Sequence, residues 1–176
     1  MKGGVFLRTN SIDVDSWAVL ERLLMPANAL VIETMLRTGL RVSDVLAIRT
    51  SQLRLRFTVT ESKTGKRKQL YLGKDLYARL KAQSGEVYVF EAAHRTDKHR
   101  TRQAVWYDVK RAARAMRIPV CVGTHSARKS FAVSEYAKCH NIGTVQRKLN
   151  HDNLETTILY LLDVFGGLGG LPPFSK

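Results

Sequence analysis

The sequence predicts an α+β fold, a mostly helical single domain with a small three-stranded antiparallel sheet. Apolar side chains recur at helical spacing near both ends of the chain, whereas the stretch 53–90 contains segments that alternate between apolar and polar residues. No glycine- or proline-rich linker divides the chain before residue 163, and 176 residues are enough to bury one hydrophobic core. We therefore expect one domain over residues 1–163 and a Gly/Pro-rich C-terminal tail over 164–176.

Helix start and stop signals divide the first third of the chain. Asp13 or Asp15 can cap a first helix, and Pro26 suits the first turn of a second. Gly39 suits the position just after that second helix, so Arg41 falls at the start of a third, where backbone N–H groups favour an anion. The predicted helices span residues 16–25, 27–38 and about 42–48.

Alternating side chains predict strands in the middle of the chain. In the first such segment Leu53, Leu55, Phe57 and Val59 share one side, as the period of two in a half-buried strand requires. The predicted elements are strands at 53–61, 68–72 and 86–90, with a turn at 63–66 and a helix at 75–82. The segment 94–102 is too polar for a core, and it is either a solvated loop or an edge that contacts phosphates.

Helices are predicted for the last third. The first is amphipathic and spans 102–116, and Pro119 ends it. Its predicted buried stripe consists of Val105, Trp106, Val109, Ala113 and Met116. Three more helices are predicted at about 126–139, 142–149 and 154–162, before glycines and prolines exclude a further one.

The charge balance points to a polyanionic partner. The chain carries 29 Lys+Arg against 15 Asp+Glu, a formal net charge of +14, and nucleic acid is the commonest partner of so basic a protein. No apolar stretch approaches the roughly 20 residues that span a bilayer, and no secretory signal is present at the start. Cys121 and Cys139 form no disulfide framework. We expect a cytoplasmic protein with no membrane partner.

The stretch 123–160 contains the residues best suited to chemistry on an anion. His125 and Arg128 are three residues apart, so they share one face of a helix. His151 and Tyr160 follow, on either side of a predicted helix start. A cation, two proton-bearing rings and a phenol together are typical of a phosphoryl-transfer site.

Four motifs, in order, resemble the tyrosine recombinase (phage integrase) family. They are Thr-Gly-Leu-Arg-Val-Ser-Asp at 38–44, Ser-Lys-Thr-Gly-Lys at 62–66, His-x-x-Arg at 125–128, and Leu-x-His at 149–151 with Tyr160 nine residues after the histidine. The resemblance covers about residues 10–163, which correspond to the catalytic domain of the family. The chain has Leu-Asn-His where many relatives have Leu-Gly-His, and Arg128-Lys129 where many have Arg-His.

The resemblance implies a site-specific recombinase that cuts and rejoins DNA through a 3′-phosphotyrosine, without a metal or a nucleotide cofactor. Tyr160 would be the nucleophile, Arg41 and Arg128 would hold the non-bridging oxygens of the phosphate, and Lys63 would protonate the leaving 5′-oxygen. His125 would assist proton removal or bind the phosphate, and His151 would donate a further hydrogen bond. Asp44, one turn after Arg41, is expected to orient that arginine. The implied catalytic residues are Arg41, Lys63, His125, Arg128, His151 and Tyr160.

The expected partner is double-stranded DNA, with a homotetramer on two DNA sites. An N-terminal clamp domain, which most of the family carries, lies outside this sequence, so an accessory protein is a further possible partner. The expected setting is the nucleoid of a bacterium, or a phage or other mobile element. Candidate DNA contacts are Lys66, Arg67, Lys68, Arg95, Lys98, Arg100, Arg102 and Lys129. Two other readings stay open: a DNA-binding regulator of the same fold without turnover, and a type IB topoisomerase-like relaxing enzyme.

Overall fold

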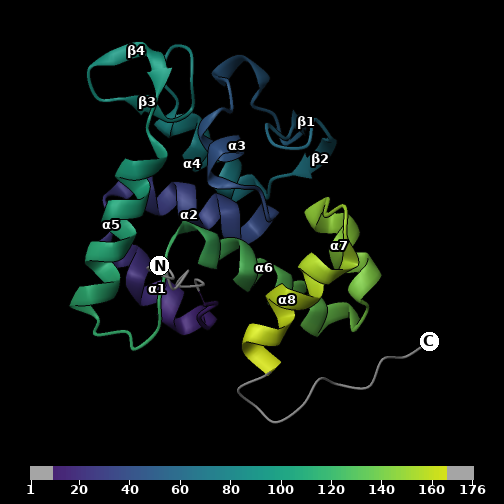
Figure 1. Ribbon diagram of the computed structural model, residues 1–176. Helices are drawn as coiled ribbons and strands as arrows, with labels where there is room; N and C mark the ends of the chain where they lie inside the picture. The colour runs from purple at the N-terminus through teal and green to yellow at the C-terminus, as the bar shows by residue number, and fades with distance from the viewer. Residues whose placement is uncertain (1–9, 166–176) are drawn as a thin grey trace, which may run out of the picture.

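The computed structural model describes residues 10–165, and Figure 1 shows a mostly helical molecule with two small β-hairpins on one side. The helices are α1 (Val14–Leu23), α2 (Pro26–Thr38), α3 (Val42–Leu46), α4 (Lys74–Gln83), α5 (Arg102–Ala115), α6 (Thr124–Cys139), α7 (Ile142–Leu149) and α8 (Leu154–Phe165), with a 3-10 turn at Thr50–Gln52. The strands are β1 (Arg56–Thr60), β2 (Arg67–Tyr71), β3 (Glu91–Ala92) and β4 (Arg95–His99). The α+β class with predominant helix is confirmed.

The helices α2 and α6 cross at the centre and pack against each other. On one side α1 and α5 pack together, and on the other α7 and α8 pack against α6 (Figure 1). The β1–β2 hairpin lies near α7, whereas the β3–β4 hairpin continues into α5. Segments from both halves of the chain therefore meet around the ends of α2, α6 and α7.

The sheet differs from the prediction, because the four strands form two separate two-stranded antiparallel sheets. In the first, β1 pairs with β2 from Arg56↔Tyr71 to Thr60↔Arg67. The predicted third strand at 86–90 is wrong, since its only pairing is an isolated bridge between Arg49 and Tyr88. Val89 and Phe90 of this segment are fully buried. A short apolar run predicts burial, but it does not distinguish a strand from an irregular core segment.

The polar segment 94–102 contains strand β4, which pairs with β3. Its side chains are almost all exposed, as its composition requires. The segment is therefore an exposed strand of a hairpin, and contact of this strand with phosphates stays a prediction.

The caps confirm the predicted ends of α2, whereas α1 spans Val14–Leu23 and so lies two residues earlier than the predicted 16–25. Asp13 accepts a hydrogen bond from the backbone N–H of Ser16 at 2.8 Å, and Pro26 occupies the first position of α2. Gly39 ends α2 with φ +68°, in the left-handed region that favours glycine. At the other end of the chain, α8 continues to Phe165, beyond the predicted residue 162. The tail predicted over 164–176 lies outside the described residues from 166 onward.

The predicted stripe of α5 is buried at Val105, Val109 and Ala113, whereas Met116 is half-buried and Trp106 is the main exception. Val105 and Val109 are fully buried, whereas Trp106 is 40% exposed. Trp106 follows Val105 by about 100° around the helix axis, at the edge of the buried face, and its large ring reaches solvent.

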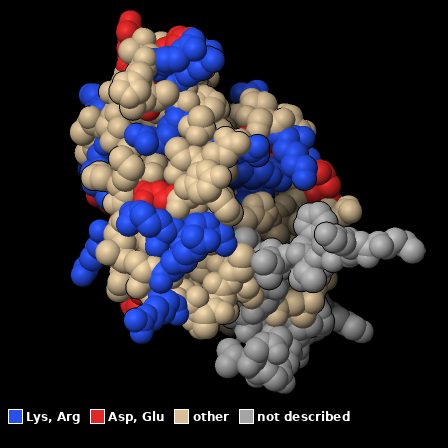
Figure 2. Space-filling model, turned by 60° about the vertical axis from the view of Figure 1, so that its left-hand side comes forward, with Lys and Arg blue, Asp and Glu red and all other residues tan. Residues whose placement is uncertain are grey.

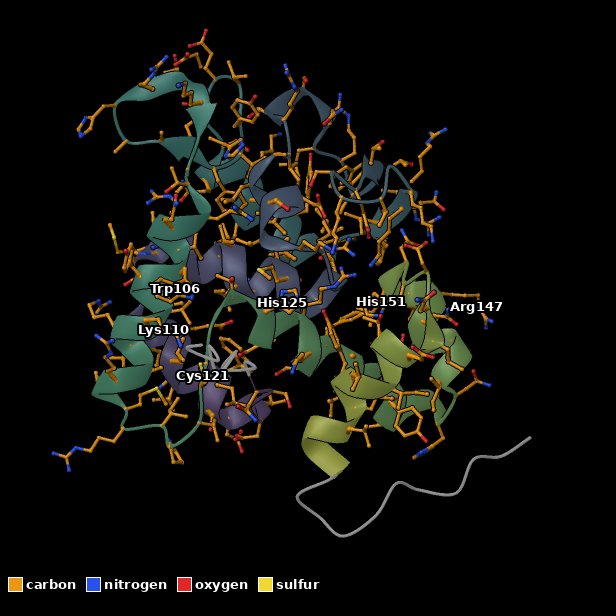
Figure 3. All side chains as sticks on the ribbon, viewed as in Figure 1. Trp106, Lys110, Cys121, His125, Arg147 and His151 are labelled. Carbon is orange, nitrogen blue, oxygen red and sulfur yellow. The ribbon has the colours of Figure 1, made fainter. Side chains whose placement is uncertain are left out.

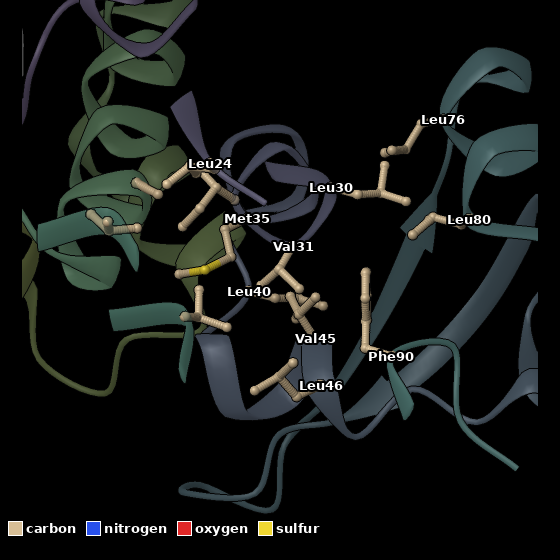
Figure 4. Packing of buried hydrophobic residues seen from close by; sticks show 14 of the residues in the cluster. Leu24, Leu30, Val31, Met35, Leu40, Val45, Leu46, Leu76, Leu80 and Phe90 are labelled. Carbon is tan, nitrogen blue, oxygen red and sulfur yellow. The ribbon is translucent and has the colours of Figure 1, made fainter. Parts of the chain in front are cut away.

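Two clusters of buried side chains hold the fold. The larger surrounds α2 and α3 and includes Val31, Met35 and Val45, which meet in the centre of Figure 4. The smaller joins α6, α7 and α8. Its members are Phe131, Ala132, Tyr136, Val145, Leu149, Tyr160 and Leu161. The smaller cluster therefore includes the residue predicted to be the nucleophile.

Candidate active site

The hydroxyl of Tyr160 lies in a hydrogen bond with His125, with 2.7 Å between the phenol oxygen and Nε2. Tyr160 is on α8 and only 9% exposed, and Leu161 next to it is buried in the cluster that joins α8 to α6 and α7. The rings of His125 and His151 both meet the Tyr160 ring edge to face, with centroids 5.7 and 5.0 Å away. The structure thus brings two predicted site residues, His125 and His151, against the phenol of a third, Tyr160.

The local structure explains where the two histidines lie. His125 is the second residue of α6, and His151 follows the end of α7; Figure 3 labels both near the middle of the molecule. Between them and α8, Asn150 ends α7 with φ +53°. Asparagine tolerates this conformation better than other non-glycine residues, so it replaces the glycine of many relatives without moving His151 out of the site. Nδ1 of His151 lies 3.0 Å from the hydroxyl of Thr157.

Arg128 is fully buried one turn after His125. Its Nη1 donates to the carbonyl oxygen of Gly39, and its Nη2 donates to that of Leu149 at 2.6 Å. Its charge and a side-chain hydrogen bond also act on Tyr160. Arg128 therefore connects the end of α2, the end of α7 and the phenol on α8.

Arg41 caps the start of α3, and its guanidinium forms an ion pair with Glu61. The Glu61 side chain has no exposed surface, and its carboxylate also accepts hydrogen bonds from Thr64 at 3.2 Å and from Asn150 at 3.4 Å. Sequence reasoning did not include Glu61. The signal was present: a charged residue at the end of a strand whose inward positions are apolar is paired when it is buried.

Asp44 does not have the role expected of it. Its Oδ1 accepts hydrogen bonds from the backbone N–H and the hydroxyl of Ser62, at 2.8 and 2.7 Å. Asp44 therefore fixes the start of the turn that carries Lys63, while Glu61 is the carboxylate that orients Arg41.

Lys63 is exposed on the turn between β1 and β2. Its charge is one of those that lower the pKa of His125, which places it near the other groups. A long side chain on an exposed turn can move towards a bound substrate, as a proton donor must.

The electrostatics of the site favour neutral histidines and a protonated phenol. Burial lowers the pKa of His151 to about 3, and the charges of Arg128 and Arg41 act in the same direction. Burial and then the charge of Arg128 lower the pKa of His125 to about 4, although part of the residue is exposed and water moderates the effect. Burial raises the pKa of Tyr160, while Arg128 opposes this shift. A neutral imidazole beside a protonated phenol is suited to accept its proton.

The predicted DNA contacts fall into two groups. Lys68 and Lys129 point inward: Lys68 binds backbone carbonyls, and the Lys129 Nζ lies 5.7 Å from the centre of the Tyr160 ring. The others lie at or near the surface. Lys66 pairs with Asp152 and Arg95 with Asp97. Arg67, Lys98 and Arg102 are exposed and Arg100 is half-buried.

Lys and Arg side chains form several clusters on the face shown in Figure 2, with few acidic side chains among them. Among residues 10–165 the structure contains no group of three or more His, Cys, Asp or Glu side chains arranged to hold a metal ion. Nor does any helix in the described part of the chain have the length and apolar character needed to cross a membrane.

The fold and the residues gathered around Tyr160 define the tyrosine recombinase class of catalytic domain. The chain belongs to the phage integrase family, whose family model matches residues 19–164.

Similar proteins share this class. The chain is 29% identical over 149 residues to the probable integrase/recombinase YoeC of Bacillus subtilis, covering 76% of this chain and 81% of YoeC. It is 29% identical over 147 residues to tyrosine recombinase XerD of Lacticaseibacillus casei, covering 74% of this chain and 48% of XerD. The fold resembles a lambda integrase tetramer bound to a Holliday junction, with a TM-score of 0.75 and 18% identity over 99% of this chain and 52% of the integrase. The chain thus spans about half the length of XerD and of that integrase.

Proposed function

We propose that this chain is the catalytic domain of a site-specific DNA recombinase or integrase that cleaves and rejoins strands through a 3′-phosphotyrosine at Tyr160. The observation that carries the proposal is the 2.7 Å hydrogen bond between the phenol of Tyr160 and His125, within reach of the charges of Arg128 and Arg41. A nucleophile, a neutral base and two guanidinium groups that can stabilise added charge are suited to attack on a phosphodiester.

In the cleavage step the phenol oxygen attacks the scissile phosphorus while the bond from phosphorus to the 5′-oxygen breaks. The phenol proton passes to Nε2 of His125, and Lys63 gives a proton to the leaving 5′-oxygen. Arg41 and Arg128 stabilise the added negative charge of the pentacoordinate state, and His151 contributes a hydrogen bond. Religation reverses these transfers, and because the phosphotyrosine is a diester no nucleotide is consumed.

Arrival of the phosphate helps the proton transfer. Burial, and next the positive charge of Arg128 and its neighbours, lower the pKa of His125 to about 4 in the absence of DNA. A phosphate anion between the arginines offsets that charge, so the pKa of His125 rises and the ring becomes a stronger base. Substrate binding would therefore make His125 a stronger base.

The DNA, assembly and setting belong to the same proposal. A basic surface with exposed Arg67, Lys98 and Arg102 supports double-stranded DNA as the substrate. Four protomers on two duplexes would complete strand exchange, with a clamp domain or an accessory protein closing around the DNA. The protein would act on the nucleoid in the cytoplasm, and the domain would span residues 1–163.

A nicked suicide duplex that contains the inverted repeats nearest the gene tests the proposal. Wild-type protein should form a covalent protein–DNA adduct, Tyr160→Phe should form none, and Tyr107→Phe, at an exposed tyrosine on α5, should match wild type. An adduct that persists in Tyr160→Phe contradicts the assignment. A mobility shift without any adduct indicates a DNA-binding regulator instead. Relaxation of a supercoiled plasmid without these repeats indicates a topoisomerase.

A further inference from the structure

Lys68 turns inward from strand β2, although its position on a basic hairpin suggested a DNA contact. Its Nζ donates a hydrogen bond to the carbonyl oxygen of Thr38 at 2.7 Å and another to that of Lys148. These partners lie 30 and 80 residues away along the chain, at the last residue of α2 and near the end of α7. The ammonium also lies 5.5 Å from the centre of the Phe131 ring on α6.

Arg128 makes the same connection one residue further along both segments, to the carbonyls of Gly39 and Leu149. The two cations thus form two adjacent links between the ends of α2 and α7. We call this arrangement the carbonyl bridge: Lys68 and Arg128 with the carbonyl oxygens of Thr38, Gly39, Lys148 and Leu149.

The carbonyl bridge has a physical basis in the ends of the two helices. The last carbonyls of a helix have no partner within it and carry its negative partial charge, so cations are stabilised there. Gly39 and Asn150 both have positive φ and turn the chain directly after the helices, and the carbonyls beside these turns accept hydrogen bonds from Lys68 and Arg128. The half-buried Lys68 and the buried Arg128 thus lie between the ends of α2 and α7.

The carbonyl bridge lies beside the segments that carry three predicted catalytic residues. Arg41 follows Gly39 by two residues, and His151 follows Leu149 by two. Lys68 itself belongs to the hairpin whose turn carries Lys63. Lys68 therefore joins the segments of Arg41 and His151 to the hairpin of Lys63.

We propose that Lys68 is a positioning residue for DNA cleavage, which joins the hairpin of Lys63 to the segments that carry Arg41 and His151 and does not contact DNA. The proposal rests on the proposed function only for its cleavage readout. The links themselves are a property of the protein without DNA. A DNA contact by Lys68 is the competing explanation.

The protonation state of Lys68 provides a second test of these hydrogen bonds. Burial, and next the charge of Arg128, lower the pKa of Lys68 to about 8, while Glu61 and Glu135 oppose the shift and Arg41 adds to it. As the pH rises through about 8 the ammonium loses a proton and its charge, so its hold on the carbonyls weakens. An arginine at this position keeps its charge throughout that range and still presents donors to two carbonyls.

The experiment compares Lys68→Met, Lys68→Arg and Gln69→Met in the full chain. Gln69 is the next residue on β2, it points to solvent, and it has no part in the site, so its substitution controls for the added methionine. The substrate is the nicked suicide duplex with the inverted repeats. The measurements are the single-turnover cleavage rate at saturating DNA, the Kd at several salt concentrations, and hydrogen exchange of the free protein.

Lys68→Met should lower cleavage at saturating DNA at least tenfold, with Kd within about twofold of wild type and an unchanged dependence of log Kd on log salt concentration. Lys68→Arg should restore cleavage to within about threefold and remove the decline between pH 8 and 9.5. Gln69→Met should match wild type. Hydrogen exchange in Lys68→Met should rise at residues 39–41, 61–67 and 149–151 before it rises elsewhere.

A weaker Kd, a salt slope reduced by about one and an unchanged saturated rate would show instead that Lys68 contacts a phosphate. Wild-type cleavage and wild-type exchange in Lys68→Met overturn the inference as well. If Lys68→Met does not fold, the rate and the pH profile of Lys68→Arg decide, and an alkaline decline that persists in this variant counts against the proposal. If wild-type protein forms no adduct, the proposed function fails. Unchanged hydrogen exchange in Lys68→Met would separately refute the proposed links between Lys68 and the two helix ends.

Discussion

Replacement of Gly39 by alanine should destabilise the protein in two ways, through backbone strain at positive φ and through overlap with the Phe131 ring. Gly39 has φ +68°, and a Cβ added there would lie 2.5 Å from Cδ1 and Cε1 of Phe131. Gly65 is the matched control, since its φ is +67° but nothing lies within 4 Å of its added Cβ. Both variants place alanine in the left-handed region, and only Gly39→Ala also creates an overlap with an aromatic ring.

The magnitudes follow from these two terms. The left-handed conformation costs a non-glycine residue about 1 kcal/mol, which is the full expected loss for Gly65→Ala. Overpacking against a buried ring adds about 1–3 kcal/mol, so Gly39→Ala should lose about 2–4 kcal/mol of unfolding free energy. For a chain of this size 1 kcal/mol lowers the melting temperature by about 2–4 °C, which gives about 2–4 °C for Gly65→Ala and about 4–16 °C for Gly39→Ala.

Thermal and urea denaturation of both variants measure these losses, and Phe131→Leu tests the cause. If the overlap is with the ring, the loss from Gly39→Ala should shrink by at least about 1 kcal/mol in a Phe131→Leu background. Because the Gly39 carbonyl accepts from Arg128, the cleavage rate of Gly39→Ala should also fall more than that of Gly65→Ala. Equal losses for Gly39→Ala and Gly65→Ala, within about 0.5 kcal/mol, would refute the packing argument.

Three further predictions concern Arg128, Asn150 and His151. Arg128→Ala should lower single-turnover cleavage by about 10²–10³-fold through lost charge stabilisation, and a rate within a few-fold of wild type in a suicide-substrate assay would exclude that role. Asn150→Gly should leave the melting temperature nearly unchanged while Asn150→Ala costs about 1 kcal/mol, because φ is +53° there; equal costs would contradict this. Burial lowers the pKa of His151 to about 3 in the folded protein against 6.5 when unfolded, so His151 alone should contribute a loss of about 2 kcal/mol of stability as the pH falls from 7 to 5, beside a separate loss from His125. His151→Gln should reduce the acid loss of stability in thermal melts by about that amount, and His94→Gln, at an exposed turn, should not; a loss unchanged in His151→Gln would show that His151 does not contribute to it.

Local signals were sufficient for most of the fold. The cap at Asp13, the proline at the start of α2 and the glycine after it are properties of a few neighbouring residues, and each helix with a clear apolar stripe formed where it was expected. Local signals did not predict the structure of the segment 86–90. Its side chains are buried as predicted, but whether a buried run becomes a strand depends on a partner with matching register, and Arg49 offers a single bridge.

Some residues of the site were likewise predictable from local motifs, and others were not. Arg41, His125, Arg128, His151 and Tyr160 were named from their motifs, and the structure places their charges and rings within mutual reach. Glu61 and Lys68 were not recognised for the contacts they make. Both act over 20 to 89 residues of separation, and no periodicity encodes which carbonyl or guanidinium a strand residue will meet after folding.

The direction in which each cation points limits what the net charge of +14 says about DNA. Lys68 and Arg128 donate hydrogen bonds to carbonyls at the helix ends, and Lys129 lies over the Tyr160 ring. These three charges are therefore partly or fully shielded from solvent. A cation that binds a carbonyl releases no counterion when DNA arrives, whereas exposed Arg67 or Lys98 can do so. The salt dependence of DNA binding should therefore report the outward cations alone, and inward cations should affect the rate of cleavage more than the affinity. Arg67 and Lys68 are neighbours on one hairpin, yet Arg67 is exposed and Lys68 binds backbone carbonyls, a difference that only the fold reveals.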